Sequence, residues 1–130
     1  MAITEQKVKE QRAEHSELAL KFLREKRLDR GDVIQASEKL YKAAEEAVKG
    51  LAEVYASDVC EEAMRRGRWT VRLLESAMDE LVRELDGEIR ASWDAAWFLH
   101  VEGFHETRID TNSVRSRLES VKKLVERVQN

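Results

Sequence analysis

The segment that begins at Asp32 constrains the fold most, because it joins a helix start signal to a long helical repeat. Asp32 stands where an N-cap residue belongs, and Gln35 follows at the spacing of a capping box. Inward-facing positions then recur at alternating intervals of four and three: Val33, Ser37, Leu40, Ala44, Ala47, Leu51 and Val54. A second stripe, at intervals of seven, holds Ile34, Tyr41, Val48 and Tyr55. This face is broad enough to contact two neighbouring helices.

The opposite face of the same segment is charged. Glu38 precedes Lys42, and Glu45 precedes Lys49, in the favourable i,i+4 order, which is worth roughly 0.2–0.5 kcal/mol for each pair. Gly50 interrupts the pattern, and a glycine inside a helix costs about 1 kcal/mol against alanine. We therefore expect a packing reason for it.

The rest of the chain predicts further helices and no strand. A polar helix spans 4–30 and ends at Gly31, and its opening, residues 1–16, is prone to fraying. The next helix either continues beyond residue 55 or restarts at Ser57 or Asp58, and it ends near Gly67. Three more helices are expected, over 70–86 with Gly87 as its stop, over 88–105, and over 113–128 behind the caps Asp110, Thr111 and Asn112.

The composition fits one domain over residues 1–130, an all-α antiparallel bundle of about five helices. The chain has no proline and five glycines, too little turn chemistry for a many-stranded β protein. The formal net charge is only -3 and 42% of residues are hydrophobic, which excludes a disordered chain and a strongly basic coat for nucleic acid. Abundant charged residues with few Asn, Gln, Cys and Met are also typical of hyperthermophile proteins.

The sequence predicts a cytoplasmic protein with no membrane partner. No apolar run approaches the roughly 18 residues of a membrane helix, and the amino terminus lacks an apolar secretion signal. The single cysteine, Cys60, cannot form an internal disulfide. It is expected to be a small buried residue rather than a nucleophile.

The histidines raise a metal site as one possibility. Glu102 and His105 have the Glu-x-x-His spacing of half a di-iron site, but no second such motif is present. We therefore expect no metal, no cofactor and no catalytic residue. His100 is expected within the apolar face of Trp93, Trp97 and Phe104, with His105 at the favourable end of the helix dipole.

A basic cluster surrounds Trp69. Its arginines are Arg65, Arg66, Arg68 and Arg72. Guanidinium groups beside an exposed ring could hold a phosphate and a base. The alternative is a solvated helix junction whose arginines pair with the acidic stretch over 75–94.

Two blocks of sequence resemble the archaeal PaREP proteins. The first is the run from Gly31 to Glu45, followed by Lys49, and it matches the characteristic Gly-Asp-x-x-Gln-Ala-Ser-Glu-Lys-x-Tyr-Lys-Ala-Ala-Glu segment of that family. The second contains Trp93, Ala96, Leu99, His100, Gly103 and Phe104. The family is itself similar to HEPN domains, helical bundles that often dimerise and bind nucleotides or cleave RNA. Their nuclease motif, Arg followed by His after four to six residues, is absent, which puts nuclease activity in doubt.

The resemblance and the basic cluster together predict a non-catalytic, HEPN-like module that binds nucleotide or RNA as a homodimer. The expected contact residues are Lys39, Lys42, Lys49, Arg65, Arg66, Arg68 and Trp69. Ser37 and Tyr41 lie on the inner side of their helix and need polar partners. These partners could lie across a subunit interface or in a pocket, and the residues expected at such a pocket are Gln35, Ser37, Tyr41, His100 and His105. Two alternatives stay open: an RNase with a non-standard active site around His100 or His105, and an antitoxin-like module that binds the protein product of a neighbouring gene.

Overall fold

The computed structural model describes residues 4–26 and 32–129, and within these ranges the chain is entirely helical, with no strand. The elements are α1 (Glu5–Arg24), α2 (Val33–Tyr55), α3 (Ser57–Arg66), α4 (Val71–Glu84), α5 (Glu88–Phe98), the π-helix η2 (Leu99–His105) and α6 (Thr111–Gln129). The predicted all-α bundle is confirmed. No helix in the described ranges is long and apolar enough to span a bilayer.

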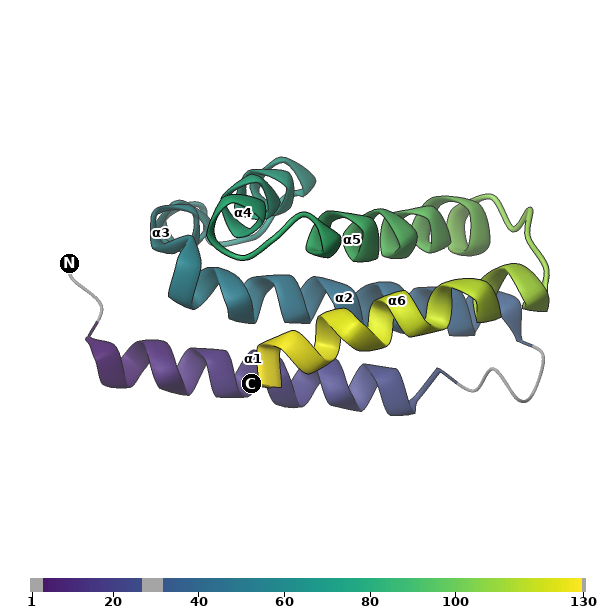
Figure 1. Ribbon diagram of the computed structural model, residues 1–130, viewed down its shortest axis with the longest axis horizontal. Coiled ribbons are helices and arrows are strands. Elements are labelled where there is room, and N and C mark those ends of the chain that lie inside the picture. The colour runs from purple at the N-terminus through teal and green to yellow at the C-terminus, as the bar shows by residue number, and fades with distance from the viewer. Residues whose placement is uncertain (1–3, 27–31, 130) are drawn as a thin grey trace.

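Helix α2 is the central element, and it contacts all the other helices. Figure 1 shows α1 alongside α2, α6 crossing both, α5 continuing above α2, and α3 with α4 at the end where α2 stops. The largest fully buried side chains come from α2, α4, α5, η2 and α6, and they include Trp93, Leu40, Leu51, Met78, Leu81, Leu99 and Leu124. The broad apolar face of α2 therefore contacts neighbours on more than one side, as the double stripe predicts.

Side chains that accept hydrogen bonds mark several helix starts. Asp32 Oδ1 accepts from the Gln35 N–H at 3.0 Å, and Thr70 Oγ1 accepts from the Leu73 N–H at 3.2 Å. Thr4 Oγ1 accepts from the Lys7 N–H at 3.1 Å, and Asp110 Oδ1 from the Ser113 N–H at 2.9 Å. The sequence offered three caps for the last helix, and Asp110 makes this bond, so α6 begins at Thr111.

The junction after α2 is settled in favour of a restart. Ala56 leaves helical geometry, with φ −140° and ψ 53°, and α3 begins at Ser57. Gly67 ends α3 in the left-handed conformation, with φ 74°, where a residue without a Cβ is not strained.

Two predicted helix ends were wrong. Helix α1 ends at Arg24 rather than Arg30, and the predicted stop at Gly31 lies outside the described residues. Helix α4 ends at Glu84, because Leu85 leaves helical geometry, with φ −112° and ψ −82°, and packs against the core. Gly87 has an ordinary φ of −76° and precedes α5 instead of stopping α4.

Some residues of the predicted apolar stripes are exposed. They are Leu18, Ile34, Val54 and Val71. The last three lie in the first or last turn of their helices, where a neighbouring helix covers only part of the surface. Gly50 has the expected packing reason, because a Cβ there would lie 2.5 Å from Cγ2 of Val128 on α6.

Candidate functional site

The π-helix η2 brings together two histidines that an α-helix would separate. At 3.6 residues per turn, residues five apart point in directions about 140° apart. A π-helix bonds each N–H to the carbonyl five residues back, and the Glu106 N–H donates to the Val101 carbonyl at 2.9 Å. His100 and His105 therefore lie on the same side of the helix, and their Nε2 atoms are 3.1 Å apart. The single α-helix predicted over 88–105 was wrong in these last residues.

Gly103 allows η2 to approach α2 closely. A Cβ at Gly103 would lie 2.1 Å from Ser37 Oγ and 3.2 Å from Cδ1 of Ile109. Ser37 is fully buried, and its hydroxyl has no hydrogen-bond partner among the described residues. The side chain of Ser37, which was expected at a pocket, packs against Gly103 where the two helices meet.

Aromatic side chains hold the His100 ring in place. It stacks on Tyr41 of α2, with ring centroids 4.0 Å apart and planes inclined by 20°. The ring centroid of Trp97 lies 5.3 Å from that of His100, and the centroid of Phe104 lies 6.1 Å from it. The expected place of His100 among aromatic residues is confirmed, and Tyr41 is the member of the group that comes from another helix.

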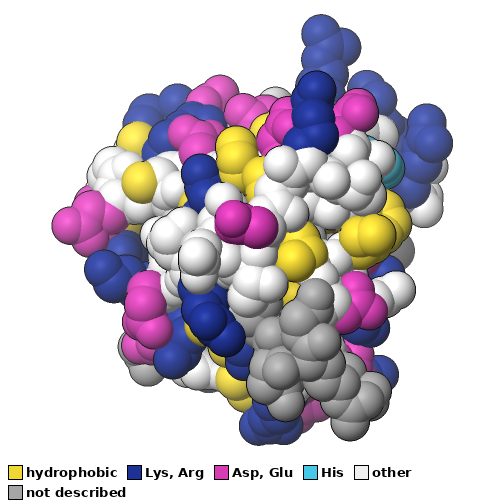
Figure 2. Space-filling view, turned by 90° about the vertical axis from the view of Figure 1, so that its right-hand side faces the viewer, with side chains coloured by type: hydrophobic (Ala, Val, Ile, Leu, Met, Phe, Trp, Pro, Cys, Tyr) yellow, Lys and Arg dark blue, Asp and Glu magenta, His cyan; other side chains and the backbone are white. Residues whose placement is uncertain are grey.

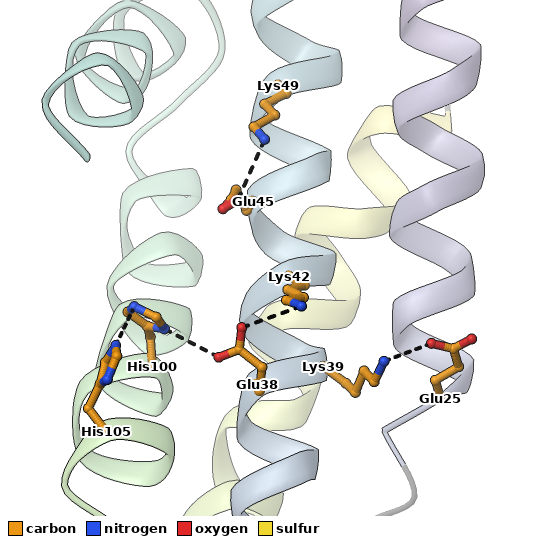
Figure 3. A network of polar contacts seen from close by, with 8 residues as sticks. All are labelled: Glu25, Glu38, Lys39, Lys42, Glu45, Lys49, His100 and His105. Carbon is orange, nitrogen blue, oxygen red and sulfur yellow. Dashed lines mark hydrogen bonds and ion pairs between the residues drawn. The ribbon is translucent and has the colours of Figure 1, made fainter. Parts of the chain in front are cut away.

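A line of polar groups runs from α2 to the surface of η2 (Figure 3). Lys42 Nζ lies 3.8 Å from Glu38 Oε1, and Glu38 Oε2 lies 3.5 Å from His100 Nδ1. Nε2 of His100 then meets Nε2 of His105. Only 19% of the His100 side chain is exposed, whereas His105 is exposed. We call this line Lys42–Glu38–His100–His105 the histidine relay.

The relay favours one arrangement of protons. A carboxylate 3.5 Å from Nδ1 of His100 favours a proton on that nitrogen. In that tautomer, Nε2 of His100 is the acceptor and the Nε2–H of His105 is the donor of the contact between the two rings. Burial lowers the pKa of His100, the charge of Glu38 opposes this, and His105 adds to the lowering. Burial raises the pKa of Tyr41, and Glu45 and Glu38 raise it further, so the phenol stays neutral. The lowered pKa of His100 favours its neutral form, and the exposed His105 is the end of the relay at the protein surface.

The backbone just beyond η2 is strained. Thr107 has φ 52°, a left-handed conformation that is rare for β-branched residues. Strained backbone and π-turns both concentrate at functional sites. One irregularity, the π-helix, therefore holds both histidines, and the other, Thr107, lies two residues beyond His105. The five-residue spacing of the histidines is the one sequence signal that could have revealed the pair, and it is meaningful only in a π-helix.

The three predicted contact lysines are engaged within the protein. Lys39 Nζ pairs with Glu25 at 3.0 Å and lies over the Phe22 ring. Lys49 lies 3.5 Å from Glu45, the predicted i,i+4 pair, and 3.3 Å from Glu46. On the face in Figure 2, Lys and Arg side chains are interspersed with Asp and Glu. Of the three lysines, only Lys42 belongs to the histidine relay.

Gln35, which was expected at the pocket, is exposed in the first turn of α2, whereas Ser37 and Tyr41 are buried.

The arginine cluster at the end of α3 pairs with a preceding acid. Arg65 and Arg66 both bond to Glu62 rather than to the acidic stretch that follows. Trp69 is half-buried and packs against the core, while Arg68 is exposed. The structure does not bring this cluster together with the histidine relay in any contact between described residues.

Cys60 is a buried free cysteine, as expected. It is buried, and burial raises its pKa to about 12, with Glu53 adding to the effect. His15, the remaining histidine, lies elsewhere and pairs with Glu46 at 3.2 Å. In the described part of the chain, no group of three or more His, Cys, Asp or Glu side chains is arranged to hold a metal ion.

The comparisons with known proteins identify a family but no activity. A family model described as the archaeal PaREP1/PaREP8 family matches residues 14–125. A crystal structure of a Sulfolobus solfataricus protein is 39% identical, with a TM-score of 0.73, and the match covers 92% of this chain and 93% of that one. A solution structure of the same target is 38% identical, with a TM-score of 0.65, and covers 91% and 88%. No curated protein matches.

Proposed function

This chain belongs to the archaeal PaREP1/PaREP8 family, and on that premise we propose that it is a non-catalytic helical module that binds a nucleotide or RNA beside its histidine relay. The observation that supports this is the exposed His105, held 3.1 Å from a His100 that is itself fixed by Tyr41 and Glu38. Imidazole N–H groups can donate to phosphate oxygens, and aromatic rings beside them can stack on a base. The HEPN-like relationship and the homodimer belong to the same proposal.

Lys42 is the lysine best placed to help bind a phosphate there. Its side chain is 45% exposed and lies 3.8 Å from Glu38, a long contact, so an incoming phosphate can compete for it. Lys39 and Lys49 are more buried and have closer carboxylate partners. Arg65, Arg66 and Arg68 remain a second contact surface in this proposal, because two of them share the single carboxylate of Glu62 and the third is exposed.

The test is a binding titration of fluorescently labelled single-stranded RNA, and separately of ATP, at low salt. We expect measurable affinity that falls steeply as salt is added. His105→Ala and Lys42→Ala should each weaken it several-fold, whereas Lys122→Ala, a matched exposed lysine on α6, should not. An absence of affinity for both ligands at low salt, or equal affinity in all variants, would overturn the proposal.

A second candidate is RNA cleavage at the same relay. It is favoured by the contact between the exposed His105 and the largely buried His100, which has Glu38 beside its other ring nitrogen. Such an arrangement can transfer a proton. Purified protein incubated with labelled RNA would show cleavage that disappears in His100→Ala and His105→Ala. Binding without cleavage would leave the first proposal in place.

The homodimer needs a surface, and exposed apolar side chains offer candidates. Leu18, Ile34, Val54, Met64 and Val71 are each between 38% and 57% exposed, and in this proposal the second copy covers some of them. The mass in solution, measured by light scattering over a range of concentrations, tests this part. A monomer at every concentration would contradict it, and it would equally weaken the antitoxin-like alternative.

A further inference from the structure

We propose that His100 and His105 together form a binding site for a divalent transition-metal ion, with their two Nε2 atoms as the protein ligands. This inference does not rest on the proposed function, because it concerns the metal ion alone.

The spacing of the two nitrogens fits one metal ion. Imidazole nitrogens bind Zn²⁺ at about 2.0–2.1 Å, so two of them on one ion lie about 2.9 Å apart at a right angle and about 3.3 Å apart at a tetrahedral angle. The Nε2 atoms of His100 and His105 lie 3.1 Å apart, between these limits. The rings are inclined by 79°, and the exposed His105 can rotate about its side-chain bonds to direct its lone pair at the ion.

The surroundings of His100 are those of a metal-binding imidazole. A ligating histidine commonly donates its other ring N–H to a carboxylate, which fixes the tautomer and makes the ligand more basic. Nδ1 of His100 faces Oε2 of Glu38 at 3.5 Å, and stacking on Tyr41 holds the ring plane. Glu38 is therefore a positioning residue that leaves Nε2 of His100 without a proton.

Metal binding replaces the contact between the two rings. The proton that His105 carries on Nε2 moves through solvent to its own Nδ1, and both Nε2 lone pairs are then free to bind the ion. The protein supplies two ligands among the described residues, so water or an anion must complete the coordination shell. Two imidazoles favour Cu²⁺, Ni²⁺ and Zn²⁺ over the oxygen-seeking Mg²⁺, with Cu²⁺ bound most tightly.

The π-helix supplies both ligands of the pair, and α2 holds the His100 ring in place. Both ligands lie on η2, and Gly103 between them fixes the position of η2 on α2. The ion would sit at the surface end of the relay, where one ligand is exposed, so it can enter and leave freely.

The test is calorimetric titration of the whole chain with Cu²⁺, Ni²⁺, Zn²⁺ and Mg²⁺, each as a simple salt. We expect one equivalent of Cu²⁺, Ni²⁺ or Zn²⁺ to bind, and no Mg²⁺. His105→Ala should abolish this binding while the circular dichroism and melting temperature stay those of the wild type. His15→Ala, which removes a histidine outside the site, should keep it, and Glu38→Gln should weaken it by roughly 10–100-fold.

Two results would overturn the inference. One is an absence of binding of all three transition metals by the wild type, which would mean that the two rings make only a hydrogen bond to each other. The other is His105→Ala binding with unchanged stoichiometry and affinity, which would place the ion elsewhere. Neither result bears on the RNA titration, so the two proposals fail separately.

Discussion

Replacing Gly103 with alanine tests how η2 is held against α2. The added Cβ would lie 2.1 Å from Oγ and 2.6 Å from Cβ of Ser37, both far inside normal contact distance. The hydroxyl can rotate away, but the Cβ of Ser37 is fixed to the backbone of α2. The helices must therefore separate, and the stacking of His100 on Tyr41 must loosen with them.

The expected cost of Gly103→Ala follows from two opposing effects. Overpacking a close contact costs about 1–3 kcal/mol, and the better helix propensity of alanine returns up to about 1 kcal/mol. A net loss of about 1–2 kcal/mol corresponds to a melting temperature lower by roughly 3–10 °C for a domain of this size. Thermal and urea unfolding followed by circular dichroism measure both quantities.

Two further variants separate a clash from other effects of the substitution. Gly87→Ala adds a Cβ in open space at an ordinary φ, so its melting temperature should equal or slightly exceed that of the wild type. Ser37→Gly removes the atoms in the way, so the double variant with Gly103→Ala should recover about 1 kcal/mol beyond the sum of the single changes. A Gly103→Ala protein as stable as the wild type, with no coupling to Ser37→Gly, would refute this account of the contact.

The remaining predictions concern a helix cap, a buried acid and the thiol. Asp32→Ala loses the bond to the Gln35 N–H and should cost about 1 kcal/mol in urea unfolding; a cost equal to that of Asp32→Asn would contradict the capping role. Burial raises the pKa of Glu53, although His15, the Cys60 thiol and Lys7 oppose the rise. The folded protein therefore holds the Glu53 proton to a higher pH than the unfolded chain does. The free energy of unfolding should fall as the pH rises through this range. Glu53→Gln should therefore raise the melting temperature more at pH 7 than at pH 4, and equal differences would count against this sign. Cys60, whose pKa burial raises to about 12, should react with iodoacetamide at pH 8 only after unfolding in urea; alkylation of the folded protein at the unfolded rate would show that the thiol is accessible.

The helices were predictable wherever their signals are local. Asp32 bonds to an N–H three residues on, and the alternation of inner and outer positions behind it depends on the helix alone. The ends were less predictable because they depend on neighbours. Helix α4 stops at Glu84 because Leu85 leaves the helical path and packs against the core, a contact with residues distant in sequence. Val71 looked like a core position by spacing but is 47% exposed, because spacing gives the direction of a side chain and not what covers it.

The sequence indicated the α2 residues of the candidate site but not the pairing of the two histidines on η2. Ser37 and Tyr41 stood out as polar residues on an apolar side, and the structure gives each a neighbour on η2: Gly103 for the serine and His100 for the tyrosine. The sequence could not indicate the pairing of His100 with His105, because a five-residue spacing points two side chains apart in an α-helix. The family match over residues 14–125 spans both sequence blocks that were singled out, and these blocks meet at this contact.

Charge in the sequence did not distinguish the lysine beside His100 from the other lysines of α2, and the reason is physical. A lysine four residues after a glutamate forms the same i,i+4 pair whether or not it binds anything, so Lys42 and Lys49 look alike in the sequence. The fold distinguishes them. Lys49 faces two carboxylates, Glu45 and Glu46. Among the described residues, Lys42 has one carboxylate partner, Glu38, and shares it with His100. Glu38 therefore joins the partly exposed ammonium group of Lys42 to the largely buried His100 ring through one side chain.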